Sequence, residues 1–249
     1  DILLFLTNDR EYRPYWWSTG NPTFLIDLLR EQRRYLPDLE NFIADDIVLD
    51  TFDVDHIDLV ALLWQTGYLT FAGKQESLDG IEYRMKIPNK EIQISLNNLF
   101  MQYLTNLGHD LRYRKKGLYQ ALCQTDMEEV RLNLSALFSS IPYQHYANKI
   151  IQNYEGYYAS VVYAYLASLG LRLIPEDTTN KGRVDLTIIL PDKVYVIEFK
   201  VDQPGKALEQ VREKGYHEKY QAAESTVYLI GMSFDSGEKN ITDFAYEKI

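Results

Sequence analysis

Cysteine and histidine are scarce in this sequence. It contains one cysteine, Cys123, and four histidines that lie far apart, among 249 residues. A single cysteine cannot form an internal disulfide bond, and it favours a reducing compartment such as the cytoplasm. We therefore do not expect a secreted domain that is cross-linked by disulfide bonds, or a zinc site of clustered Cys and His ligands. Cys123 itself is predicted to be a packing residue.

Long apolar runs are also absent. No run reaches 18 apolar residues, and no charged-then-apolar leader opens the sequence, so we expect no membrane span and a cytoplasmic location. The phosphate-binding pattern G-x-x-x-x-G-K-[ST] does not occur either, which argues against nucleotide hydrolysis by these residues alone. With 46% hydrophobic residues, the sequence can bury substantial cores, in one large or two smaller domains.

The net charge of −10 at first argues against a nucleic-acid partner, but its distribution is uneven. Residues 1–100 hold 9 Lys and Arg against 17 Asp and Glu, whereas residues 101–249 hold 17 against 19. Phosphate binding requires local positive potential rather than a basic average. The second part offers two basic clusters, each of which is otherwise a solvated helix face: Arg112, Arg114, Lys115 and Lys116, and Lys206, Arg212, Lys214 and Lys219.

The first hundred residues predict a separate, mainly helical unit. We expect helices over 22–34 and 53–66, strands over 68–72 and 81–87, and a further helix over 90–107. Two helices followed by a two-stranded wing are similar to a winged helix, a fold that serves nucleic acid or docks proteins. The acidity of this part favours protein docking. A connecting helix is predicted over 112–129.

The most informative pattern is a predicted β-hairpin with charges inside it. Its apolar runs, 184–190 and 194–201, are rich in β-branched and aromatic residues and are separated by a Pro-Asp-Lys turn. Because strand side chains alternate between faces, Glu198 and Lys200 point the same way. Asp185 on the partner strand lies beside Glu198 if the register allows. The hairpin is therefore predicted to gather two carboxylates and one ammonium group.

Such a cluster has two interpretations. An ionised carboxylate that is removed from water is costly unless it is paired with another charge or with a metal ion. The cluster is thus either a salt bridge at a strand end, with Lys200 pairing Glu198 or Asp185, or a site for a hard cation such as Mg²⁺. The D-x₁₂-E-x-K spacing does not decide between them.

The neighbouring segments favour a functional site. Residues 154–169 predict a helix that is apolar nearly all round, as expected of a buried helix, and Glu155 is its only carboxylate. Residues 206–220 predict an amphipathic helix whose polar side offers Gln210 and Lys214. A strand over 226–232 follows, so the predicted order is helix, strand, strand, helix, strand.

With this order the sequence resembles the PD-(D/E)XK nuclease superfamily, in which a helix carries a Glu, the next strand an Asp and the following strand an E-x-K. Several phrases also resemble bacterial proteins that join an AAA-type ATPase-like domain to a C-terminal nuclease domain of this superfamily. These phrases are Y-W-W-S-T-G-N-P-T-F-L (15–25), L-L-W-Q-T-G-Y-L-T (62–70), Y-R-M-K-I-P-N-K-E (83–91), S-S-I-P-Y (139–143) and K-G-Y-H-E-K-Y (214–220). Because the phosphate-binding loop of such relatives is missing, the sequence is expected to be a fragment.

The resemblance implies metal-dependent hydrolysis of nucleic acid, with DNA as the expected substrate. Asp185 and Glu198 would hold Mg²⁺, or Mn²⁺ in its place, with the Phe199 carbonyl as a further ligand, and Glu155 would bind a second ion or a metal-bound water. Lys200 would position the attacking water, or act as a base if burial lowers its pKa. Gln210 would orient phosphate or water. Arg183 and Lys214 are weaker candidates for phosphate contact.

The expected fold class is α+β. A helical winged-helix-like unit, the tail of an ATPase-like domain, is expected over 1–107, a helical connector over 108–133, and a restriction-endonuclease-like domain with a central mixed sheet flanked by helices over 134–249. The expected partners are nucleic acid and the ATPase-like portion of the same protein, with no membrane. The rival function is a catalytically inactive nuclease-fold platform that binds protein or nucleic acid. The oligomeric state and the choice between DNA and RNA stay open.

Overall fold

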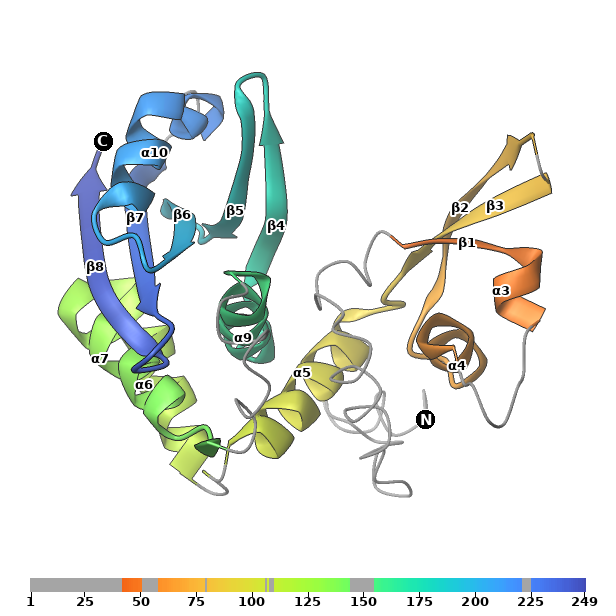
Figure 1. Ribbon diagram of the computed structural model, residues 1–249, viewed down its shortest axis with the longest axis horizontal. Coiled ribbons are helices and arrows are strands. Elements are labelled where there is room, and N and C mark those ends of the chain that lie inside the picture. Colours follow the sequence, from red (N-terminus) through yellow and green to blue (C-terminus); the bar gives the residue numbers. More distant parts are fainter. Residues whose placement is uncertain are drawn as a thin grey trace. The chain divides into compact units, whose positions relative to one another are not determined.

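The chain folds into two compact units, residues 1–103 and 104–249, in a computed structural model (Figure 1). The predicted helix over 22–34 lies outside the described residues. The structure describes residues 42–50, 58–78, 80–105, 107, 110–143, 155–220 and 225–249.

The N-terminal unit contains a three-stranded antiparallel sheet in the order β1-β3-β2. The two predicted strands are therefore present, although β2 extends to residue 77 instead of ending at 72, and a short third strand, β1, pairs with the β3 edge. The described elements are β1 (Ile43–Asp45), α3 (Asp46–Asp50), α4 (Leu59–Gln65), β2 (Thr70–Ser77), β3 (Gly80–Lys86) and α5 (Lys90–Leu104).

Helix α4 begins later than the sequence pattern predicts. Asp58 has an extended backbone, and its carboxylate accepts hydrogen bonds from the N–H groups of Val60 and Ala61 at 2.8 and 3.0 Å. Asp58 is therefore an N-cap. The predicted start at residue 53 is wrong for this helix, because the cap fixes its first turn at Leu59.

The predicted connecting helix over 112–129 is two helices, α6 (Asp110–Gln124) and α7 (Met127–Ser139). The two helices are separated at Thr125, whose backbone is left-handed with a φ of 61°. The Asp126 carboxylate then caps α7, because it accepts a hydrogen bond from the Glu129 N–H at 3.1 Å. Cys123 lies exposed near the end of α6, so its predicted packing role is wrong.

Helix α9 (Glu155–Ser168) is the predicted apolar helix, and every residue from Tyr158 to Ser168 is buried. Its apolar surface is therefore covered on all sides, as expected when a helix packs against a sheet and other helices. Among the described residues, no helix is both long and apolar enough to cross a membrane.

The C-terminal unit is built on a five-stranded mixed sheet in the order β4-β5-β6-β7-β8. Only β6 and β7 pair in parallel, and α10 connects them. The predicted hairpin and mixed sheet are confirmed, whereas β4 and β8 were not predicted. The elements are β4 (Arg172–Thr179), β5 (Gly182–Ile189), β6 (Lys193–Val201), α10 (Lys206–Lys214), the 3₁₀ helix η4 (Tyr216–Tyr220), β7 (Thr226–Asp235) and β8 (Asn240–Lys248).

Helices cover both faces of this sheet (Figure 1). On one face Val196 packs with Val211 of α10 and Tyr216 of η4. On the other face the Tyr195 hydroxyl donates to the carbonyl of Leu122 in α6 at 2.7 Å. Strand alternation thus divides β6 between two cores, and the charged residues at its end follow the same alternation.

Candidate active site

The site lies where strands β5 and β6 separate. Their pairing ends with Leu186 opposite Ile197, so Asp185 and Glu198 are the next residues along the two strands. There the Asp185 carboxylate accepts the backbone N–H of Phe199 at 2.7 Å. A side chain thus replaces the backbone partner at this point of the ladder. This arrangement keeps Asp185 beside Glu198, as the sequence predicts.

Glu198 is the most buried acid of the site, with 2% of its surface exposed. Its Oε1 atom accepts hydrogen bonds from Lys200 Nζ, at 3.2 Å, and from Gln210 Nε2. Its Oε2 atom is buried and has no hydrogen-bond partner among the described residues. A buried acceptor without a partner costs roughly 1–3 kcal/mol, and more when it is charged. One carboxylate oxygen is therefore fixed and the other is available to a ligand.

Burial raises the pKa values of all three carboxyl groups of the site. Burial, and then the negative charge of Asp185, raise the pKa of Glu198 to about 7, although Lys200 opposes this. Burial also raises the pKa of Asp185 and of Glu155. The three carboxyl groups thus favour an added proton or an added cation.

Lys200 is the cation of the site. Its Nζ donates to the Phe199 carbonyl at 2.9 Å and lies 3.6 Å from Oε1 of Glu155, in the first turn of α9. Burial lowers the pKa of Lys200, but the carboxylates of Glu198 and Glu155 outweigh burial and the net shift is upward. Lys200 is therefore protonated in this arrangement, which does not meet the condition under which it would act as a base.

Gly231 explains how α10 reaches Glu198. This glycine pairs with Glu198 on the neighbouring strand β7, and a Cβ atom there would lie 2.6 Å from the Cα atom of Leu208 in α10. Only glycine permits so close an approach of the helix to the sheet. Gln210, two residues further along α10, then contacts Glu198. Sequence reasoning missed Gly231, although a lone glycine within an apolar strand is the signal for such an approach.

Tyr216 is a second residue that sequence reasoning missed. Its side chain is buried in the core beneath α10, and burial, followed by the negative charge of Glu198, raises the pKa of its hydroxyl. The structure thus brings Asp185, Glu198, Lys200, Glu155 and Gln210 together and adds Tyr216 in the adjoining core.

Neither of the two weaker candidates for phosphate contact forms a described hydrogen bond or ion pair with these residues, although the charge of Arg183 acts to lower the pKa of Asp185. Arg183 is largely exposed and pairs with Glu176, and Lys214 is exposed in the last turn of α10. Three cations of the basic cluster around α10 are also paired with acids: Lys206 with Glu209, Arg212 with Glu247 and Lys219 with Asp177. This cluster is therefore less basic than its sequence suggests.

The donor set of the site suits a hard cation. Within the described parts of the chain, no group of three or more His, Cys, Asp or Glu side chains is arranged to hold a metal ion. Two neighbouring carboxylates are nevertheless present, and the unpartnered Oε2 of Glu198 is an oxygen ligand of the kind that Mg²⁺ prefers. Asp185 and Glu198 would hold the ion, whereas Glu155 is engaged with Lys200.

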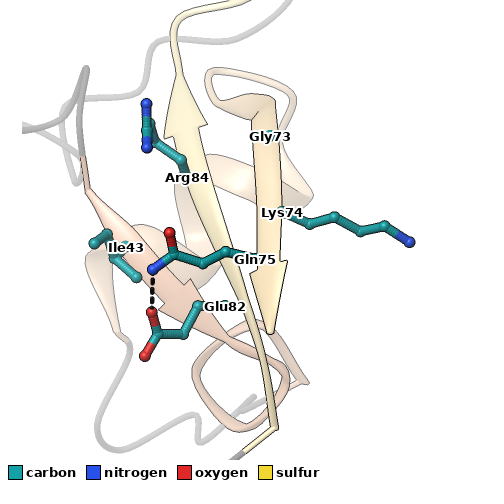
Figure 2. Close-up of a pocket in the computed structure, with 6 residues that line it drawn as sticks. All are labelled: Ile43, Gly73, Lys74, Gln75, Glu82 and Arg84. Atoms are coloured by element: carbon teal, nitrogen blue, oxygen red, sulfur yellow. Dashed lines mark hydrogen bonds between the residues drawn. The ribbon is translucent and has the colours of Figure 1, made fainter. Parts of the chain in front are cut away.

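A separate shallow pocket lies on the sheet of the N-terminal unit. Figure 2 shows Gln75 donating a hydrogen bond to Glu82 across β2 and β3, at 2.8 Å, while Lys74 points away. Its lining residues are Ile43, Gly73, Lys74, Gln75, Glu82 and Arg84. The lining has one carboxylate, which is already paired, so this pocket does not resemble the acid cluster of the C-terminal unit.

Comparisons with known proteins agree with this geometry. Residues 153–244 match the family model described as PD-(D/E)XK nuclease superfamily, so this part of the chain is a domain of that superfamily. The chain is also 41% identical, over 251 aligned positions, to the "Uncharacterized protein in vnfD 5'region" of Azotobacter chroococcum mcd 1. That alignment covers 99% of this chain but 48% of the relative, so the chain spans about half the relative's length. No solved structure matches the chain.

Proposed function

We propose that the chain is a Mg²⁺-dependent nuclease that hydrolyses phosphodiester bonds, with DNA as the expected substrate. The observation that carries this proposal is the buried Glu198, whose Oε1 is fixed by Lys200 and Gln210 while its Oε2 has no partner among the described residues. Asp185 beside it supplies a second carboxylate. Residues 134–249 are proposed as the limits of the nuclease domain.

The residues have distinct proposed roles. Asp185 and Glu198 hold the ion, which when bound acidifies water and neutralises charge on the phosphate. Lys200, being protonated, donates hydrogen bonds to the attacking water and to the phosphate oxygens. As the water oxygen bonds to phosphorus and the ester oxygen leaves, the water gives up a proton to bulk solvent and the leaving oxygen takes one from solvent. Gln210 orients the same water or phosphate. Glu155 keeps Lys200 in place. Arg183 and Lys214 contact phosphates of the nucleic acid that lie further from the cleaved bond.

The test is cleavage of labelled single- and double-stranded DNA and RNA with Mg²⁺ or Mn²⁺. Lys200→Met should abolish cleavage, because it removes the only described cation in contact with Glu198. Lys248→Met removes an exposed lysine of the same unit, in β8, and should retain most of the activity. No metal-dependent cleavage by the folded wild-type chain on any substrate would refute the proposal.

A catalytically inactive platform is the second candidate. The ion pairs of Lys200 with Glu198 and Glu155 favour it, because they already neutralise part of the acid cluster. A platform would bind nucleic acid or protein with an affinity that does not change when Mg²⁺ is added. Nucleic-acid binding without metal dependence and without cleavage would favour this candidate.

We further propose that the N-terminal unit is winged-helix-like and docks an ATPase-like portion. Support comes from the order β1, α3, α4, β2, β3, which is strand, helix, helix and hairpin, and from the acidity of this part of the sequence. The relative from Azotobacter chroococcum is about twice as long as the alignment. Cleavage by that relative should depend on ATP if such a portion gates the nuclease, and ATP-independent cleavage would contradict gating.

A further inference from the structure

Helix α6 has an exposed face that the acids and Lys200 do not explain. Leu111, Leu118 and Leu122 of this helix are buried in the core of the C-terminal unit. With about 3.6 residues per turn, the positions on the side away from these leucines form one continuous exposed stripe. We call it the α6 stripe, and it consists of Arg112, Tyr113, Lys116, Tyr119, Gln120 and Cys123.

The α6 stripe is basic and aromatic. It carries no Asp or Glu and no aliphatic side chain, and its two tyrosines are 79% (Tyr113) and 46% (Tyr119) exposed. Neither Arg112 nor Lys116 forms an ion pair with any residue that the structure describes. By contrast, three cations of the basic cluster around α10 are paired with acids. The positive charge of the α6 stripe is therefore not neutralised by neighbouring acids.

The side chains of the α6 stripe match single-stranded nucleic acid better than they match a protein. A protein-docking surface has an apolar centre, whereas the leucines of α6 are buried. Guanidinium and ammonium groups bind phosphates, and an exposed tyrosine ring can stack on a base that is not paired. Tyr113 and Lys116 lie on adjacent turns of the helix, so a ring and a cation can contact one strand together.

Helix α9 sets the distance between the α6 stripe and the acids. Lys115 of α6 donates from Nζ to the carbonyl of Ser168, the last residue of α9, at 2.6 Å. Glu155, at the other end of this 14-residue helix, is paired with Lys200. At about 1.5 Å per residue, α9 is roughly 20 Å long. A nucleic acid on the α6 stripe is therefore bound well away from the phosphate that is cleaved.

We propose that the α6 stripe binds a single-stranded segment of the nucleic-acid substrate, roughly 20 Å from the cleaved bond. Arg112 and Lys116 contact phosphates, and Tyr113 and Tyr119 stack on unpaired bases. This deepens the proposed nuclease function and rests on it for the identification of the bound strand as a substrate. Binding itself depends on the exposed side chains of α6, so it can be measured without cleavage.

The first test measures binding of a fluorescently labelled oligothymidylate by anisotropy in EDTA, where metal-dependent cleavage does not occur. The double change Arg112→Gln and Lys116→Gln should weaken binding about tenfold. It should also reduce the slope of log K against log salt by about 1.4, because each lost contact with a single strand contributes about 0.7.

The control for this test is the double change Arg131→Gln and Lys248→Gln. It removes two positive charges elsewhere in the C-terminal unit, since Arg131 of α7 is paired with Glu128 and Lys248 lies in β8. This variant should bind the oligothymidylate with the affinity and the salt slope of the wild type. Equal losses in the two variants would indicate a general effect of net charge and would overturn the proposal.

The second test separates stacking from charge. Tyr113→Ala should weaken binding of the single strand at least fivefold and leave binding of a duplex of the same length unchanged, because paired bases offer no free face. Tyr246→Ala is the control, since Tyr246 is 53% exposed in β8 and should contribute to neither affinity. Unchanged single-strand affinity in Tyr113→Ala, or an equal loss for the duplex, would overturn the proposal.

The third test is cleavage of a long labelled single strand with Mg²⁺. The Arg112→Gln and Lys116→Gln variant should raise KM about tenfold with kcat unchanged, because the α6 stripe contacts no reacting atom. If the wild type binds the single strand through α6 but cleaves nothing, the nuclease function fails and the binding surface stands. If the variant binds and cleaves as the wild type does, the nuclease function stands and the proposal for α6 fails, which leaves the stripe to a protein partner.

Discussion

Glu198 and Gly231 lie side by side on the parallel strands β6 and β7, and the acid depends on the glycine for its contact with α10. The helix approaches so closely that a Cβ atom at position 231 would lie 2.6 Å from the Cα atom and 2.7 Å from the Cβ atom of Leu208. Because the obstacle includes backbone, a side chain at 231 can be accommodated only if α10 moves. Gln210 would move with the helix.

Gly231→Ala is therefore expected to lower both stability and activity. Overpacking of this kind costs typically about 1–3 kcal/mol. The displacement of α10 should also separate Gln210 from Glu198 and reduce cleavage at least tenfold. Gly73→Ala is the control, since Gly73 is also a strand glycine but has nothing within 4 Å of its Cβ position. Equal urea midpoints and equal cleavage rates for the two variants would contradict this account.

Asp177→Ala should destabilise the C-terminal unit more than any change of an exposed acid. It removes the shared partner of Thr187, Lys219 and Tyr220 and leaves the buried Thr187 hydroxyl without this acceptor. Deleting one member of such a network costs about 3–5 kcal/mol. Urea unfolding measures the loss, and Glu238→Ala, a change of an exposed acid in a turn of the same unit, is the control. A loss no larger than that of the control would show that Asp177 does not anchor η4.

The hairpin with its acids and lysine could be predicted because its signal is local. Alternation along β6 alone places Glu198 and Lys200 on one face, and the register across the short turn, with Leu186 opposite Ile197, brings Asp185 to the same face. Glu155 and Gln210 were predicted as site residues from the order of the helices and strands and from the resemblance to the PD-(D/E)XK superfamily. The cationic state of Lys200 could not be predicted, because it depends on how closely Glu198 and Glu155 approach its ammonium group.

The elements that sequence reasoning missed are defined by tertiary contacts. Strand β4 (Arg172–Thr179) contains a proline and several polar residues and pairs with β5 on one side only, so its pattern is weak. The break at Thr125 lies within a sequence that favours helix, and the cap at Asp126 decides it. Gly231 and Tyr216 are ordinary residues for a strand and a core. Only the approach of α10 and η4 gives them their importance.

Metal binding should stabilise the folded chain through Asp185 and Glu198. A ligand that binds the native state alone raises the free energy of unfolding by RT ln(1 + [L]/Kd), about 2.7 kcal/mol at one hundred times Kd. Mg²⁺ or Mn²⁺ should therefore raise the melting temperature of the wild type, and Asp185→Asn should abolish the increase. Glu238→Gln, a change of an exposed acid, should preserve it. An increase that survives in Asp185→Asn would place the ion elsewhere.

Glu198 should make the metal-free chain less stable as the pH rises. Its pKa is raised from 4.5 to about 7 in the folded chain, so between these values the folded state binds more protons than the unfolded state. The free energy of unfolding must then fall with rising pH across this window, by up to about 3 kcal/mol, since one pKa unit corresponds to about 1.4 kcal/mol. The stabilising contribution is complete below pH 4.5 and is lost as the pH rises through about 7.

Glu198→Gln tests the origin of this slope, because it keeps the size of the side chain and removes its ionisation. Urea unfolding from pH 4.5 to pH 8 should show a smaller decline for the variant than for the wild type. Saturating Mg²⁺ should flatten the wild-type decline in the same way, because the ion replaces the proton as the partner of the buried carboxylate. If the variant declined as steeply as the wild type, the proton would belong to Glu155 or Asp185 instead, whose pKa values burial also raises.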